Sequence, residues 1–97
     1  MAPDFQGACN MRHLANADFR KLKDALPKEI RDLAQKQFSL LKADPKHPSL
    51  HFKKLRGTRR WSARVGLGYR AVAEEVEDGV LMWFWIGTHG DYDRLVQ

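Results

Sequence analysis

The chain has 97 residues, of which 43% are hydrophobic and 30% charged, so its size and composition are those of one folded domain. Its longest apolar run, Val80 to Ile86, is too short to cross a bilayer, and the first ten residues lack the basic and apolar segments of a signal peptide. The single cysteine, Cys9, excludes an internal disulfide framework. We therefore expect a cytoplasmic protein, and we exclude a secreted mini-protein, a membrane protein and a multidomain enzyme.

Positive charge is concentrated in one segment of the chain. The sequence holds 17 Lys and Arg against 12 Asp and Glu, a net charge of +5. Residues 45–73 contain eight basic side chains and no acidic one, so the rest of the chain is net negative. Such a block is typical of a face that binds a polyanion, with nucleic acid the leading candidate; an ordinary solvated surface and an acidic protein partner are the alternatives. The eight residues are Lys46, Lys53, Lys54, Arg56, Arg59, Arg60, Arg64 and Arg70.

The first ten residues have no hydrophobic periodicity and contain Pro3 and Gly7, which predicts a flexible N-terminal tail. The patterned sequence that follows, residues 11–97, is expected to form a single domain. Within it, Met11 to Leu14 fits a short extra strand at an edge of the sheet.

Two helices follow, with a very short joint between them. Asn16 or Asp18 can cap the first helix, and Pro27 suits the first turn of the second. The second helix must end near Ala43, because the residue before Pro45 disfavours helical geometry. These signals predict a helical hairpin with an apolar stripe on each helix. The stripes are Phe19, Leu22 and Leu26 in the first helix and Ile30, Leu33, Ala34, Phe38 and Leu41 in the second.

The remaining sequence is rich in aromatic and β-branched residues and predicts four short strands. Asp78-Gly79 is a strong signal for a two-residue hairpin turn, which needs a positive φ. Short connections force neighbouring strands to be antiparallel. The predicted fold class is therefore α+β, with the helical hairpin packed on a four-stranded antiparallel β-sheet. The expected strands are Leu50 to Leu55, Trp61 to Val65, Tyr69 to Val76 and Val80 to Ile86.

The last predicted strand is apolar on both faces. Strict alternation places Met82, Phe84 and Ile86 on one face and Trp83 and Trp85 on the other. The helical hairpin can cover only one of these faces. The other face then needs a second cover, such as a partner protein.

Two arginines lie on neighbouring predicted strands. Arg64 alternates with apolar residues and so points away from the apolar side of its strand, and Arg70 follows six residues later across a glycine turn. Together with Lys53 or Lys54 they can converge on one phosphate, because guanidinium groups match its oxygens. The alternative is that both arginines form surface salt bridges with one of three acids, Glu74, Glu75 or Asp93.

His89 and Tyr92 follow the last strand. An imidazole can exchange a proton with a ribose hydroxyl or a leaving oxygen near neutral pH, and a tyrosine can stack on a base or bind a phosphate. The alternative is that Tyr92 packs against the sheet and His89 caps the strand. His47 and His51 have an H-x3-H spacing but lack the further ligands of a zinc site, so we expect no metal and no cofactor.

Nearly the whole chain, about residues 12–96, resembles the RelE/ParE superfamily of toxins from bacterial type II toxin–antitoxin systems. The resemblance rests on two helices before an antiparallel sheet and on three motifs. These are Trp-Ser-x-Arg-Val at 61–65, Tyr-Arg-Ala-Val at 69–72 and Ile-Gly-Thr-His-x-x-Tyr-Asp at 86–93. The last motif is especially similar to HigB-like sequences.

The resemblance implies a toxin that a cognate antitoxin neutralises. RelE-like and HigB-like members cut mRNA in the A site of the translating ribosome without a metal, whereas ParE-like members poison DNA gyrase. A non-catalytic protein- or RNA-binding module on the same fold is a third alternative. Basic residues on the sheet and a C-terminal His or Tyr mark the ribonuclease branch, so an mRNA endoribonuclease is the function expected here.

The resemblance also implies site residues. The basic segment holds no acid that could act as a general base, so Lys54 or His89 would take that role. The implied catalytic residues are Arg64, Arg70, His89, Tyr92 and Lys54. RNA contacts would come from Lys53, Lys54, Arg56, Arg59 and Arg60, and antitoxin contacts from Trp83 and Trp85.

Overall fold

The computed structural model describes residues 11–96, and the predicted N-terminal tail, residues 1–10, lies outside the described residues. In chain order the elements are β1 (Arg12–Ala15), α1 (Ala17–Asp24), α2 (Lys28–Ala43), the 3-10 turn η2 (Pro48–Leu50), β2 (Lys53–Lys54), β3 (Arg60–Arg64), β4 (Tyr69–Glu77), β5 (Val80–Thr88) and α3 (His89–Val96).

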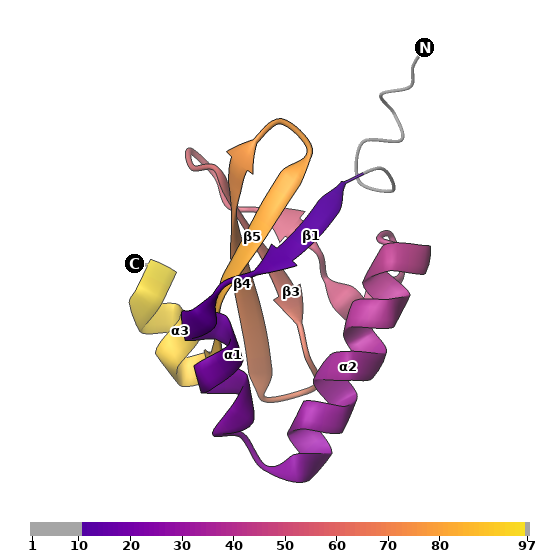
Figure 1. Ribbon diagram of the computed structural model, residues 1–97, viewed down its shortest axis with the longest axis vertical. Coiled ribbons are helices and arrows are strands. Elements are labelled where there is room, and N and C mark those ends of the chain that lie inside the picture. Colours follow the sequence, from indigo (N-terminus) through magenta and orange to yellow (C-terminus); the bar gives the residue numbers. More distant parts are fainter. Residues whose placement is uncertain (1–10, 97) are drawn as a thin grey trace.

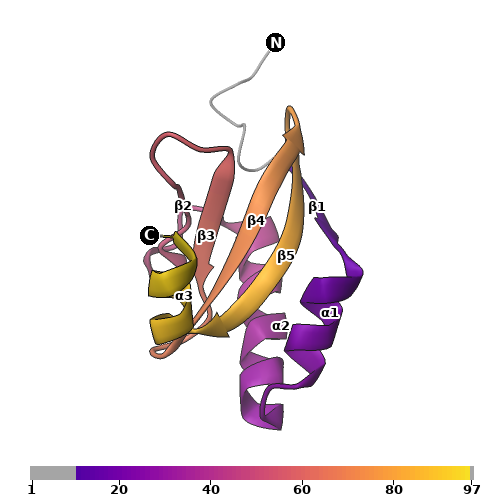
Figure 2. The ribbon, with the colours of Figure 1, turned by 90° about the vertical axis from the view of Figure 1, so that its left-hand side faces the viewer.

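The strands form one sheet in the order β1-β5-β4-β3-β2, with helices on both faces (Figure 1). Helices α1 and α2 cover one face, and α3 lies on the other, as the side view in Figure 2 shows. The predicted α+β class is confirmed. The structure adds a helix on the second face, where none was predicted.

The predicted helical hairpin is confirmed. Asn16 caps α1, because its Oδ1 accepts a hydrogen bond from the Phe19 amide at 2.9 Å. Helix α2 begins directly after Pro27. Its apolar stripe packs on the sheet and includes the buried residues Ala34 and Leu41. None of the described helices is long and apolar enough to span a membrane.

Strands β2 to β5 form the predicted antiparallel meander. The β4–β5 hairpin turns at Asp78-Gly79, as predicted, with Gly79 at φ +79°. The first of these strands is shorter than predicted. Strand β2 has two residues, because Pro48–Leu50 form a turn that buries Leu50 and the next residue, His51, adopts a φ of +43°.

A fifth strand, β1, lies at one edge of the sheet beside β5. The predicted extra edge strand is confirmed, one residue further along the chain than expected. It runs parallel to β5, with Arg12 opposite Val80 and Ala15 opposite Trp83. The sheet is therefore mixed, a small departure from the antiparallel sheet that we predicted. Most of the chain lies between β1 and β5, so no tight turn constrains their relative direction.

Strand β5 contains a β-bulge at Phe84. Val72 of β4 pairs with Trp85, and the next residue, Ala73, pairs with Trp83, so Phe84 is an extra residue in β5. Paired residues share a face of the sheet, and successive residues of β4 point to opposite faces. Trp83 and Trp85 therefore point to opposite faces, and the strict alternation predicted for this strand is wrong.

The bulge brings Trp83 and Ile86 into one core. Trp83 is 4% exposed and Ile86 2% exposed, and both pack with Ala63 and Ala71 beneath the helical hairpin. A buried Trp83 cannot serve as an exposed antitoxin-binding residue, which corrects that prediction. Trp85 is half-buried on the opposite face.

The second face of the sheet is partly covered by α3, an element that the sequence analysis does not predict. Thr88 caps this helix, because its Oγ1 accepts a hydrogen bond from the Asp91 amide at 3.2 Å. The helix packs on β4 and β5 and buries Tyr92. The chain therefore covers part of its own second face, and the expectation that a partner must do so is corrected.

A half-buried histidine of β1, His13, packs against core residues. The indole N–H of Trp83 donates a hydrogen bond to Nδ1 of His13 at 3.0 Å, and the Phe38 ring packs edge-on against the imidazole. Burial lowers the pKa of His13 below its ordinary value of 6.5, and the positive charge of Lys42 lowers it further. The fold therefore favours a neutral His13 whose Nδ1 accepts.

Acidification should weaken the fold through His13. The unfolded chain takes up this proton at a higher pH than the folded chain, so the free energy of unfolding should fall as the pH drops below 6.5. The loss includes the Trp83 hydrogen bond, about 1 kcal/mol. In His13→Asn the amide oxygen can accept the same bond without titrating, so urea denaturation between about pH 7.5 and 5 should show a shallower decline. Equal declines in the two proteins would contradict this role for His13.

Candidate anion-binding site

The face of the sheet that α3 partly covers carries a cluster of basic side chains. The Tyr92 hydroxyl donates a hydrogen bond to Ser62 Oγ at 3.3 Å, which places Ser62 on this face. Arg64 lies two residues further along β3 and pairs with Arg70 of β4. Lys53 of β2 pairs with Ser62. We call Lys53, Arg60, Arg64 and Arg70 the basic face.

Arg70 is the most buried member of the basic face. It is 8% exposed, and its Nε and Nη1 atoms are buried without a hydrogen-bond partner. Its guanidinium carbon lies 5.0 Å from the centre of the Tyr92 ring, in a cation–π contact. A buried charged group without hydrogen-bond partners costs free energy. An anion that reached these two nitrogens would supply the missing acceptors.

Two aromatic side chains lie on this face near Arg70: Tyr92 contacts it, and Trp85 lies against the residue that pairs with it. Tyr92 is 7% exposed, so almost all of its ring is in contact with the protein. The Trp85 ring lies against Gly87, the residue that pairs with Arg70, and a Cβ at Gly87 would come within 2.7 Å of that ring. Of the two roles considered for Tyr92, packing against the sheet fits this burial and stacking on a base does not.

His89 lies next to the same tyrosine. The centres of the His89 and Tyr92 rings are 6.0 Å apart, and the His89 side chain is about half exposed. Its Nδ1 lies 3.4 Å from an Oδ of Asp93, one turn further along α3. A carboxylate at Nδ1 orients the imidazole and leaves Nε2 for proton exchange. The Tyr92 ring therefore has Arg70 and His89 as close neighbours.

Arg64 and Arg70 form no salt bridge within residues 11–96. Of the acids considered as partners, Asp93 lies beside His89 and the Glu75 carboxylate is bonded to other groups. The alternative in which these arginines serve as surface salt bridges is therefore wrong.

Lys54 lies on the opposite face from Arg70. It pairs with Trp61, whose ring packs against the core beneath α1 and α2. A lysine on that face is separated from Arg70 by the sheet, so the catalytic role predicted for Lys54 does not fit the structure. Lys53 is the lysine of β2 that shares a face with Arg70.

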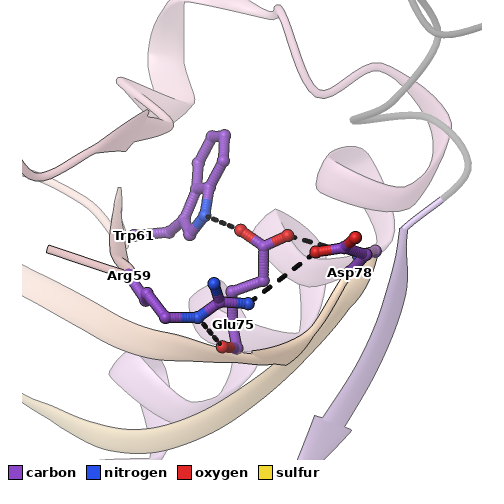
Figure 3. A network of polar contacts seen from close by, with 5 residues as sticks. Arg59, Trp61, Glu75 and Asp78 are labelled. Carbon is purple, nitrogen blue, oxygen red and sulfur yellow. Dashed lines mark hydrogen bonds and ion pairs between the residues drawn. The ribbon is translucent and has the colours of Figure 1, made fainter.

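Arg59 contacts residues at the turn between β4 and β5 (Figure 3). Its Nε donates to the Glu75 carbonyl at 2.8 Å, and its Nη2 lies 3.9 Å from a carboxylate oxygen of Asp78. The Glu75 carboxylate accepts hydrogen bonds from the Gly79 amide at 3.2 Å and the Trp61 indole at 3.3 Å. The bond from Gly79 is the main cause that lowers the pKa of Glu75. Arg59 is thus engaged with the hairpin.

The predicted RNA-binding residues are spread over the molecule. Lys53 and Arg60 lie on the basic face, where Arg60 also stands 5.2 Å from the Phe84 ring. Arg56 is exposed in the loop between β2 and β3. Ser62 is a site residue that the sequence analysis misses, although its place two residues before Arg64 is a signal for it. Across the part of the chain that the structure describes, no group of three or more His, Cys, Asp or Glu side chains could hold a metal ion.

Comparisons with known proteins give one family and several related folds. The family model for the ParE-like toxin domain matches residues 28–94. A comparison with curated protein sequences finds no match. Among solved structures, the archaeal RelE–RelB complex from Pyrococcus horikoshii OT3 is similar with a TM-score of 0.64 and 22% identity, covering 84% of this chain and 97% of that one.

Two further solved structures have the same fold. YafQ from E. coli strain BL21(DE3) is similar with a TM-score of 0.65 and 15% identity over 84% of this chain and 97% of that one. The isolated E. coli RelE toxin gives a TM-score of 0.59 and 20% identity over 89% of this chain and 95% of that one. This chain therefore spans almost the whole length of the folds that it matches.

Replacing the unpartnered guanidinium should stabilise the protein while removing anion binding. Met fills a similar volume without a buried charge, so Arg70→Met should raise the free energy of unfolding by about 1 kcal/mol. Sulfate should raise the melting temperature of the wild-type protein more than chloride does at equal ionic strength, and it should not do so in Arg70→Met. Lys36→Met, at an exposed position of α2, is the control for general salt effects. A less stable Arg70→Met protein with unchanged sulfate response would contradict the site.

Proposed function

We propose that this chain, which belongs to the ParE-like toxin domain family, is a toxin of a type II toxin–antitoxin system that cleaves mRNA on the ribosome in the cytoplasm. The observation that carries this proposal is the buried, unpartnered guanidinium of Arg70 on a face with three further basic residues. Such a face fits a phosphodiester backbone, and the reaction at a phosphodiester gathers negative charge that fixed cations stabilise.

The proposed chemistry is a transesterification within the RNA strand. The ribose 2′-oxygen attacks the adjacent phosphorus as its proton leaves, and the bond between phosphorus and the 5′-oxygen breaks. The 5′-oxygen takes up a proton, which leaves a 2′,3′-cyclic phosphate on one product and a free 5′-hydroxyl on the other. Arg70 and Arg64 bind the phosphoryl oxygens as their charge grows.

His89 is the proposed proton-transfer residue. It is half exposed, so a substrate can reach its Nε2, and Asp93 lies beside its other nitrogen. It exchanges one of the two protons of the reaction, and solvent exchanges the other. Tyr92 acts through Arg70, since its ring and hydroxyl hold the guanidinium and Ser62 in place. Lys53 steers the RNA backbone onto the basic face.

Substitutions should separate the chemical step from RNA binding. Arg64→Ala, Arg70→Ala and His89→Ala should each lower ribosome-dependent cleavage by about 10²-fold, as loss of charge stabilisation or acid–base catalysis does. Lys53→Ala should weaken the binding of mRNA. Lys54→Ala removes an equal charge on the other face of the sheet and should leave the cleavage rate of bound mRNA unchanged. Growth arrest, mRNA cleavage maps and circular dichroism measure the effects. If all three variants stay folded and fully toxic, the ribonuclease proposal fails, and altered plasmid supercoiling would then support a gyrase inhibitor.

We also propose a cognate antitoxin as partner. The complexes of similar fold pair RelE with RelB and YafQ with DinJ. In this chain the basic face and the half-buried Trp85 together suit an amphipathic, acidic antitoxin segment.

A small protein encoded next to this gene should bind the chain and protect cells from it. Trp85→Ala should weaken the complex about 10-fold or more, because aromatic anchors carry much of the energy of interfaces. Leu22→Ala on α1, an exposed apolar residue on the other face of the sheet, is the matched control. Titration calorimetry at two salt concentrations checks both the anchor and the charge complementarity. If the affinity of the complex depends neither on Trp85 nor on the salt concentration, the antitoxin binds elsewhere on the chain.

A further inference from the structure

A hollow of about 490 Å³ lies on the opposite side of β2 from the basic face. Its walls come from the loop between α2 and β2 and from the start of β3. The side chains around it are aromatic, imidazole or proline rings with one lysine, Lys46. None of these residues has a part in the cleavage chemistry proposed above.

Two stacked aromatic rings form one wall of the hollow. The centres of the Phe52 and Trp61 rings are 4.8 Å apart, and their planes meet at 23°. Both residues are half-buried, so each has part of its surface open to solvent. The Trp61 indole N–H donates to Glu75, which fixes the orientation of the ring. The pair is therefore a preformed aromatic platform.

Two histidines stand at the rim of the hollow. His47 Nδ1 accepts a hydrogen bond from the Ser49 amide at 3.2 Å, which sets the direction of its ring. His51 is exposed and has a φ of +43°, the left-handed conformation that a residue with a Cβ rarely adopts. Backbone strain of this kind concentrates at binding and catalytic sites.

The side chains around the hollow favour a nucleic acid as its ligand over an acidic peptide. Its lining residues all come from the segment 45–73, which contains no acid, and two basic residues of this segment lie on its side of the sheet: Lys46 lines the hollow, and Lys54 pairs with Trp61. Glu75, the acid that the Trp61 indole contacts, accepts hydrogen bonds from Trp61 and from the Gly79 amide. Every nucleobase has a flat face that can stack on an aromatic ring, and cationic side chains nearby attract the backbone that carries it.

We infer that this hollow is a stacking subsite for one unpaired nucleobase of a single-stranded RNA. This inference rests on the proposed function, since it places a flanking nucleotide of the same RNA. Strand β2 has only two residues and lies at the edge of the sheet. The strand pairs β4–β3 and β3–β2 separate Arg70 from this edge by two strand spacings, about 10 Å. An RNA backbone that crosses the edge therefore meets Lys53 on one side and the platform on the other.

The test measures binding without the ribosome. The probes are a fluorescein-labelled decamer of uridine and an abasic decamer with the same sugar–phosphate backbone. The wild-type protein should bind the uridine decamer about 10-fold more tightly than the abasic one, as stacking of one base provides. Phe52→Leu keeps an apolar side chain but removes the ring, so it should abolish this preference and leave abasic binding unchanged. His51→Asn, which tolerates the same φ, should reduce the preference in part.

Phe19→Leu is the matched control, because it makes the same change at a half-buried position on α1. It should keep the preference for bases. Equal affinity of the wild-type protein for the two decamers, or an equal loss for both in Phe52→Leu, would overturn the subsite. A preference that survives Phe52→Leu would overturn it as well. The two proposals fail separately. If the protein prefers the uridine decamer but its Arg64 and Arg70 variants remain toxic, the subsite is supported and the cleavage chemistry is rejected.

Discussion

One extra residue in β5 determines what each face of this sheet can do. Without the bulge at Phe84, Trp83 and Trp85 would share a face, and Ile86 would point away from the helical hairpin. With it, Trp83 and Ile86 complete the core beneath α1 and α2, and Trp85 lies on the other face against Gly87, the residue that pairs with Arg70. The interior that stabilises the fold and the aromatic support of the site therefore depend on the same local shift of register.

The site places a charged group where folding alone does not favour it. Arg70 is buried on the face that α3 covers, with two of its nitrogens unbonded and the Tyr92 ring in cation–π contact with its guanidinium. An alternative made of arginines paired with Glu74, Glu75 or Asp93 would have been more stable and inert. In the proposed function the unpaired donors would bind a phosphate, and the lower stability of the free protein would be the cost of that preorganised site.

Local signals were sufficient for much of the fold. The cap at Asn16, the start of α2 after Pro27 and the turn at Asp78-Gly79 each follow from residue chemistry over a few positions. The pairing of Arg64 with Arg70 followed from alternation and a short connection. The faces to which the side chains of β5 point did not follow from local signals. A β-bulge depends on how two strands pair, and the sequence of one strand does not show it.

Two other features escaped prediction for a similar reason. Helix α3 has only eight residues, and its stability comes from Tyr92 packing on the sheet more than from its own composition. Lys54 was placed with Arg70 because two adjacent lysines give no indication of which one faces the site. The register of β2 against Trp61 and Ser62 decides that question, and register is a property of the assembled sheet.

The position of Tyr92 in the chain also has a consequence for synthesis. Arg70 acquires its support only when α3 docks, and α3 follows the whole sheet in sequence. Strand β1, near the start, must likewise wait for β5 before it can pair. A nascent chain emerges in order and forms its long-range contacts late. The site is therefore complete only after the last helix, residues 89–96, has left the ribosome and docked on the sheet.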